Sequence, residues 1–168
     1  MVHRVKVKSI LWLTDYDFTI QRGGGGLIKV INAAKYFVYL SYGEKSRSLT
    51  PLKLQKLLYL AQGWSYIWDD KPLFMNDFEA WQYGPVCVEA YNYFKGYHGD
   101  EIPECEGISS LSNVESEETI KAVWDDFSDY TAYELVELTH RQDPWIDAYK
   151  QHTTITKQDI KHYFQSTF

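Results

Sequence analysis

The sequence predicts a mainly α-helical, compact single domain of about six helices, with one small β-hairpin near residues 72–83. Three observations support this prediction. Apolar residues recur at helical spacing in most segments, helix-start signals precede several of them, and strands do not alternate with helices. The last observation excludes a Rossmann fold or another parallel sheet. With 168 residues, 45% of them hydrophobic, the chain has ample material for one buried core.

Two helices are expected in the first half of the domain. The first covers residues 30–42 and ends before Gly43, which suits a C-terminal cap. The second begins at Thr50 and Pro51, because the threonine hydroxyl can accept an orphan backbone N–H and the proline has no N–H to lose. It continues to about Trp68 with a wide apolar stripe. Almost opposite lies a second stripe, the Gln–Tyr stripe, formed by Gln55, Tyr59, Gln62 and Tyr66. We expect the Gln–Tyr stripe to be wet or covered by a partner.

The periodicity changes between Pro72 and Tyr83, where large apolar residues flank a central Asn and Asp in a way typical of a hairpin. Gly84 and Pro85 are then expected to end the strand. Pro85 is expected at the first position of a third helix, which ends near Gly96. Residues 99–118 are acidic and contain proline and serine, so a long loop is expected there.

The last third of the chain carries further helix-start signals. Ser116 is expected to cap a fourth helix, and Thr131 with Glu134 has the capping-box pattern for a fifth helix over residues 133–139. A short helix over residues 143–150 is expected to begin at Asp143, Pro144 and Trp145, with the aspartate as its cap. Thr156 with Asp159 is a similar signal for the last helix.

Residues 1–29 differ from the rest and are interpreted as an N-terminal extension with a glycine-rich linker, since four consecutive glycines at 23–26 disfavour any regular element. An alternative interpretation stays open. A purine-rich ribosome-binding sequence translated in frame gives an Arg-Gly run such as residues 22–26, and Leu27 can be encoded by a bacterial initiation codon. Under that hypothesis the protein starts at Leu27.

The charge is asymmetric: residues 1–60 carry ten Lys or Arg against three acids, and residues 61–168 carry seven against twenty. The acidic part makes nucleic-acid binding an unfavourable interpretation and leaves room for a basic partner. No predicted helix carries the convergent Arg and Lys residues of a DNA-recognition helix, and only Lys53 and Lys56 on the second helix come close. No apolar run is long enough to span a membrane, and we expect a cytoplasmic protein.

Motifs for catalysis, cofactors or metals are not found in the sequence. The glycine run lacks the spacing of a nucleotide-binding loop, and Cys87 and Cys105 lack zinc-site spacing, so no cofactor and no metal is predicted. The best enzymatic alternative is a cysteine hydrolase with Cys87, His140 and Asp143 as nucleophile, base and acid. We expect instead that His140 forms a hydrogen bond that holds the turn into Asp143 and Pro144.

Four segments occur in a characteristic order: AAKYFVYLS, LTPLKLQKLLYLAQGW, KPLFMNDFEAWQYGPVCVEAYNYFK and LVELTHRQDPWIDAY. Together they resemble the Panacea antitoxin-domain family, which includes SocA-like and phage-associated GepA-type proteins. The resemblance covers about residues 30–164, so residues 30–168 are interpreted as the Panacea-like domain. It implies a non-enzymatic protein that binds and neutralises a toxin encoded by an adjacent gene. Some relatives act as adaptors, which implies delivery of the toxin to an ATP-dependent protease as an alternative.

The candidate toxin-binding residues lie in two places, the Gln–Tyr stripe and the corner formed by Trp81, Tyr83, Gly84 and Pro85. Trp81 and Tyr83 are expected on opposite faces, one buried and the other exposed. Tyrosine favours interfaces because it offers a large contact area at low entropic cost. Six residues are expected to have structural roles: Thr50, Pro51, His140, Asp143, Pro144 and Trp145.

Overall fold

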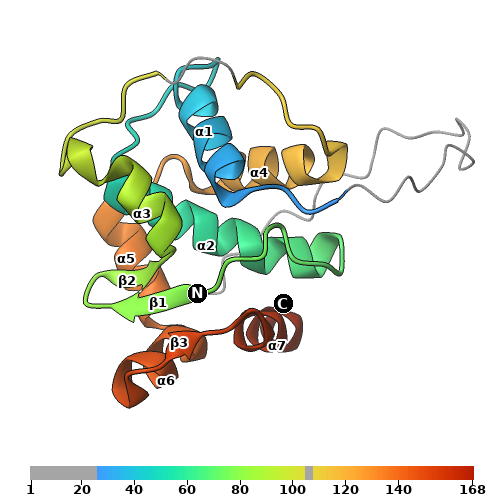
Figure 1. Cartoon of the computed structure of the whole chain (residues 1–168), viewed down its shortest axis with the longest axis vertical. Helices are drawn as coiled ribbons and strands as arrows, with labels where there is room; N and C mark the ends of the chain where they lie inside the picture. The colour runs from blue at the N-terminus through green and yellow to red at the C-terminus, as the bar shows by residue number, and fades with distance from the viewer. Residues whose placement is uncertain (1–25, 105–107) are drawn as a thin grey trace, which may run out of the picture.

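The computed structural model describes residues 26–104 and 108–168, and these form a helical domain with one small sheet (Figure 1). Its described helices are α1 (Val30–Ser41), α2 (Pro51–Trp68), α3 (Val88–Phe94), α4 (Val114–Phe127), α5 (Ala132–His140), α6 (Asp143–Gln151) and α7 (Lys157–Thr167), with a 3-10 turn at Lys95–Tyr97. The strands are β1 (Phe78–Trp81), β2 (Gly84–Val86) and β3 (Thr154–Ile155). The predicted mainly α fold is confirmed: each of the seven segments expected to be helical contains one of the seven described α-helices, although the expected total was about six.

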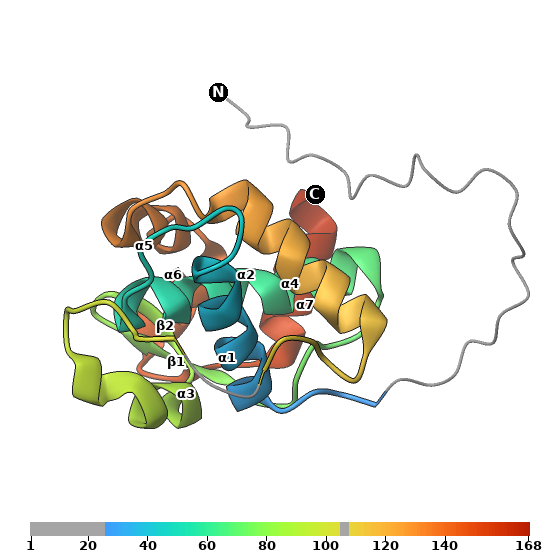
Figure 2. The ribbon, with the colours of Figure 1, turned by 90° about the horizontal axis from the view of Figure 1, so that it is seen from above.

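Helix α2 runs through the middle of the molecule, with α1 and α4 on one side and α7 on the other (Figure 1). From above, α1 and α4 lie across it (Figure 2). It begins as predicted, since the Thr50 hydroxyl accepts from the Lys53 N–H and Pro51 is the first helical residue. Fifteen of its 18 residues are buried, so both of its faces belong to the core.

The contact between α2 and α7 requires a glycine. A Cβ atom added to Gly63 would lie 2.2 Å from the ring of Phe164, a fully buried residue of α7. The absence of a side chain at position 63 therefore lets the phenyl ring pack directly on the α2 backbone. This close approach covers a face of α2 that sequence periodicity assigns to solvent.

The hairpin is confirmed, but its second strand is displaced from the prediction. Glu79 pairs with Val86, Ala80 with Pro85 and Trp81 with Gly84. Gly84 and Pro85 therefore lie inside β2 rather than ending a strand, and α3 begins only at Val88. Proline is tolerated there because β2 is an edge strand of the order β2-β1-β3, and an edge strand need not use every N–H.

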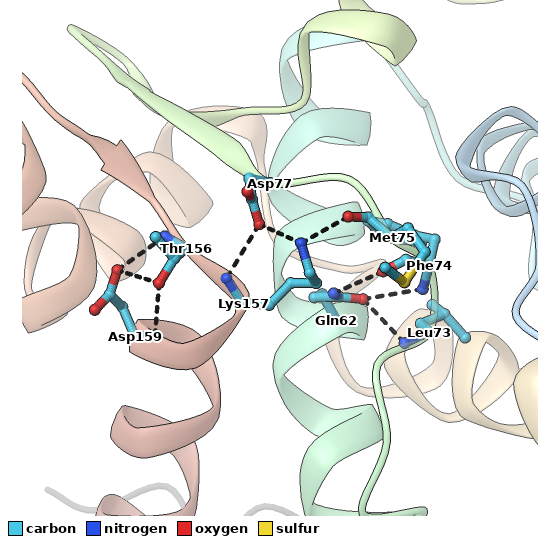
Figure 3. Close-up of polar contacts among 8 residues, drawn as sticks. All are labelled: Gln62, Leu73, Phe74, Met75, Asp77, Thr156, Lys157 and Asp159. Carbon is cyan, nitrogen blue, oxygen red and sulfur yellow. Dashed lines mark hydrogen bonds and ion pairs between the residues drawn. The ribbon is translucent and has the colours of Figure 1, made fainter.

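The third strand, β3, was not predicted. It pairs antiparallel with β1 through Phe78 and Ile155, and it leads directly into α7. The capping box of Thr156 and Asp159 at the start of α7 is confirmed. Lys157 fixes this junction, since its Nζ donates to Asp77 at 2.6 Å and to the Met75 carbonyl at 2.7 Å (Figure 3).

Among the predicted caps of α4, α5 and α6, two are wrong and one is confirmed. Helix α4 is capped by Asn113, whose Oδ1 accepts from the Ser116 N–H, so Ser116 lies inside the helix. Asp143 is the first residue of α6 rather than its cap, because the preceding Gln142 has the extended backbone of a cap position. The capping box of Thr131 and Glu134 is present at α5.

The expected N-terminal extension, with its linker or alternative start, falls almost wholly on residues 1–25 and so lies outside the described residues. The expected acidic loop is shorter than predicted, because α4 already begins at Val114. None of the described helices combines the length and apolar character needed to cross a membrane.

Candidate functional site

Three of the four motif segments meet at the β1–β2 hairpin. Residues from α2, from the end of α5 and from α6 each contact its backbone, although they lie far apart in the sequence. The side chains of residues 81–83, here called the hairpin tip, point to solvent. The site is therefore described from the hairpin backbone outward.

Lys56 on α2 supports the inner side of the hairpin. Its side chain is fully buried, and its Nζ donates to the Pro85 carbonyl at 2.8 Å. Burial lowers the pKa of Lys56 to about 7, because a charged ammonium without a counter-ion loses its hydration in the interior. A buried lysine with a carbonyl partner fastens β2 to α2.

Gly84 has a reason to be glycine at this contact. Its φ is +96°, a backbone conformation that side chains disfavour. A Cβ atom there would lie 2.8 Å from the Thr139 hydroxyl and 2.9 Å from Lys56 Nζ. Gly84 thus lets α2 and α5 approach the hairpin at one point.

Gln55 holds the next turn of the chain. Its Oε1 accepts from the Cys87 N–H at 2.8 Å, just before α3 begins. The Cys87 side chain is buried, and burial raises the pKa of its thiol. A raised pKa disfavours the thiolate that a cysteine nucleophile requires, so the geometry gives the hydrolase alternative no support.

His140 and Trp145 fasten the outer side of the hairpin. Trp145 Nε1 donates to the Trp81 carbonyl at 3.0 Å, and the His140 ring stacks on the Trp145 ring with centroids 3.9 Å apart. Burial lowers the pKa of His140, with a hydrogen bond to the Gln82 backbone as an opposing influence. The described residues show no hydrogen bond from His140 to the turn at Asp143 and Pro144; its ring instead stacks on Trp145 in the first turn of α6.

The Gln–Tyr stripe is buried, so the expectation that it is exposed is wrong. Gln55 and Tyr66 are 4% and 5% exposed, and Tyr59 and Gln62 are fully buried. The reason is the central place of α2, which has neighbouring elements on all sides. Burial raises the pKa of Tyr66 to about 12, in keeping with a core position.

Gln62 shows the role that this stripe has instead. Its Oε1 accepts from the Leu73 and Phe74 N–H groups, and its Nε2 donates to the Phe74 carbonyl (Figure 3). These three bonds pair the backbone of the loop that leads into β1. Gln62 and Gln55 therefore fix the two ends of the hairpin segment.

The hairpin tip is where side chains remain exposed. Trp81 is 36% exposed and Tyr83 is 51% exposed, whereas Gly84 and Pro85 are buried. The predicted alternation of Trp81 and Tyr83 is wrong, because residues two positions apart share a face of a strand and because Tyr83 lies in the turn beyond β1. A wholly fastened backbone thus presents two aromatic side chains to solvent.

The structural role of Lys56 does not follow from the sequence. Lys56 and Lys53 are expected as basic residues on one helix, but both are buried, and Lys53 Nζ donates to the Ser128 carbonyl. Neither presents a charge to a nucleic acid. One sequence feature could have indicated this burial: Lys56 lies in a helix that is apolar on most sides.

Other features of the described residues do not add to this site. Within residues 26–104 and 108–168, no group of three His, Cys, Asp or Glu side chains is placed to hold a metal ion. An open depression of about 440 Å³ lies between α1 and α4 and is lined by Tyr39, Lys45, Lys121 and Trp124 among others. It is separate from the residues that fasten the hairpin.

The chain matches a known protein family. A family model described as "Antitoxin SocA-like, Panacea domain" matches residues 54–146, which is more than half of the chain. This span runs from α2 to α6 and contains Gln55, Lys56, the hairpin, His140 and Trp145. Searches of curated proteins and of solved structures found no match.

Proposed function

The chain belongs to the family of SocA-like antitoxins with a Panacea domain, and on this premise we propose that it neutralises a cognate toxin by binding it directly. The toxin is expected to be the product of an adjacent gene, as the resemblance implies. Membership in an antitoxin family suggests a non-enzymatic role. The proposal also agrees with the raised pKa of the Cys87 thiol.

We propose the hairpin tip as a principal toxin contact. The observation that carries this is the fastening of the hairpin backbone by Gln55, Lys56, His140 and Trp145, while Trp81 and Tyr83 stay exposed. A rigid backbone that presents aromatic side chains loses little conformational entropy on binding. Aromatic side chains of this kind dominate the binding energy of many interfaces.

The first test is co-expression of the full chain with the product of the neighbouring gene. Growth rescue and co-purification of the two proteins are expected. Tyr83→Ala should weaken the complex by about tenfold or more, since central aromatic residues contribute over about 1.4 kcal/mol. Its free energy of unfolding should change by less than about 0.5 kcal/mol, because Tyr83 is exposed.

Tyr133→Ala is the matched control, because Tyr133 is also an exposed tyrosine, at 67%. It lies near the start of α5, whereas the hairpin contacts the end of that helix at His140. It should leave both rescue and affinity unchanged. No rescue by the wild-type chain at any expression ratio would exclude the proposed function. Equal loss from both variants would exclude the hairpin tip as the contact.

The mechanism of neutralisation has its own test. Direct occlusion predicts that rescue survives in a host that lacks its ATP-dependent proteases. Rescue that disappears in this host would instead indicate an adaptor that delivers the toxin for degradation. If neutralisation is by occlusion, the purified chain should inhibit the purified toxin without any protease present.

A further inference from the structure

Trp81 and Glu79 form a fixed pair on the exposed face of β1. The two residues are separated by one position, so their side chains share a face of the strand. Trp81 Nε1 donates to Glu79 Oε2 at 2.6 Å. The Tyr91 ring packs edge-on against the indole at 4.8 Å, and Trp145 holds the Trp81 carbonyl. A carboxylate and the exposed part of an aromatic ring are therefore held side by side.

The same combination occurs elsewhere in the molecule with a cation added. At the α1–α4 contact, Lys121 Nζ lies 6.0 Å from the Tyr36 ring centroid and 2.6 Å from Glu117 Oε1. The lysine interacts with the ring face and with the carboxylate at once. Each of these attractions favours a positive charge in that position.

A second example joins α2 to α7. Lys161 Nζ lies 5.8 Å from the Tyr66 ring centroid and 3.1 Å from Asp70 Oδ1. In both examples the cation comes from a different helix than the aromatic ring. An aromatic ring next to a carboxylate thus receives a lysine from another element of the fold.

The Trp81–Glu79 pair has no such cation among residues 26–104 and 108–168, where Glu79 forms no ion pair. The surrounding segments, 77–94 and 132–157, contain seven acidic residues and three basic ones, Arg141, Lys150 and Lys157. Lys157 is already paired with Asp77. Arg141 already lies 3.9 Å from Glu137. The local potential around the pair is therefore negative and attracts a positive group from outside the fold.

We propose that the Trp81–Glu79 pair receives a positively charged side chain, arginine or lysine, from the toxin. This inference rests on the proposed function and names the chemistry of its partner. The cation lies over the exposed indole and forms a charge-assisted hydrogen bond with the Glu79 carboxylate. An arginine suits both contacts, since its planar guanidinium stacks on an aromatic face and donates through its edge. An acidic or nucleic-acid partner would be repelled.

The test measures binding of the full chain to the protein encoded by the neighbouring gene. Glu79→Gln removes the charge but keeps an oxygen that can accept from Trp81 Nε1, so the indole stays in place. It should weaken binding by about tenfold and reduce the salt dependence of the affinity. Glu79→Lys should weaken binding by about a hundredfold, because it places two cations together.

Glu101→Gln and Glu101→Lys are the matched controls, since Glu101 is an exposed acid outside the hairpin. Both should bind within about twofold of the wild-type chain if the effect belongs to the pair. Equal weakening by the Glu79 and Glu101 variants would assign the effect to overall charge and overturn the proposal.

Two further outcomes separate this inference from its premise. If Glu79→Gln binds as the wild-type chain does while Tyr83→Ala loses affinity, the cation receptor is wrong and the proposed function stands. If the wild-type chain does not bind the neighbouring protein at all, the proposed function fails and this inference fails with it.

Discussion

The Gln–Tyr stripe of α2 and the hairpin tip are built from similar residues but lie in opposite environments. Gln62 and Tyr59 are fully buried, whereas the hairpin tip exposes half of Tyr83. The amide of Gln62 forms three hydrogen bonds to a neighbouring loop. Tyr83 lies in the two-residue turn between β1 and β2, and about half of its surface is exposed.

This difference shows that packing by other segments of the chain decides whether glutamine and tyrosine side chains are buried or exposed. Helix α2 has α1, α4, α5, α7 and β2 around it, so glutamine and tyrosine there must find partners inside the protein. The backbone of the hairpin tip is fastened by Trp145 and His140, and the Trp81 ring is held by Glu79 and Tyr91. The exposed parts of Trp81 and Tyr83 are left for contacts outside the fold.

The largest effect is expected for tyrosine truncation in the α2 stripe. Tyr59→Ala should lower the free energy of unfolding by about 4 kcal/mol, because it removes a fully buried aromatic ring. Tyr59→Phe should be neutral or stabilising by up to about 1 kcal/mol, since the buried hydroxyl has no hydrogen-bond partner among the described residues. Chemical denaturation of both variants measures this. A loss above about 1 kcal/mol for Tyr59→Phe would reveal a partner for the hydroxyl.

The next effect concerns the glutamine that fastens the loop before β1. Gln62→Ala should lower the free energy of unfolding by about 3 kcal/mol, because the Leu73 and Phe74 backbone groups lose their partners in the interior. Gln158→Ala, at an exposed glutamine of α7, is the control and should change it by less than about 0.5 kcal/mol. Similar denaturation midpoints for the two variants would contradict the fastening role.

The effect that is smallest per pH unit concerns Lys56, which joins the two regions. Burial lowers its pKa to about 7 from the usual 10.5. Between these values the unfolded chain binds a proton that the folded chain lacks. The free energy of unfolding should therefore rise with pH, by at most about 1.4 kcal/mol per pH unit from this group.

Lys56→Met lacks this titration, so its free energy of unfolding relative to the wild-type chain should fall as pH rises from 7 to 10. Equilibrium denaturation at several pH values measures the difference, in which contributions from the other titrating groups cancel. Lys150→Met, at an exposed lysine, is the control for loss of charge. A difference that does not vary with pH would contradict an uncharged, buried Lys56.

Much of the fold follows from local signals. Thr50 with Pro51, Thr131 with Glu134 and Thr156 with Asp159 start helices at the predicted places. These signals work because a capping side chain pairs backbone groups within three residues of itself. Where two candidates stood close together, as with Asn113 and Ser116, residue type alone did not choose between them.

The candidate site was only partly predictable. The corner around Trp81 and Tyr83 was proposed from its residues, and it lies within residues 54–146, which the family model matches. The buried places of Gln55 and Lys56 were not identified, because they depend on β2 packing across α2. The spacing of residues within α2 does not show which elements pack against the face that carries the Gln–Tyr stripe.

By itself, the sequence determined the helical class, most helix starts, the hairpin and the family of this protein. Each of these is encoded in short segments, through side-chain spacing and capping. Only the tertiary structure decided which glutamines and tyrosines are buried, why position 84 must be glycine, and that Glu79 and Trp81 lack a cation within the described residues. These properties arise from contacts between segments distant in the sequence, and burial and charge pairing depend on all neighbours at once.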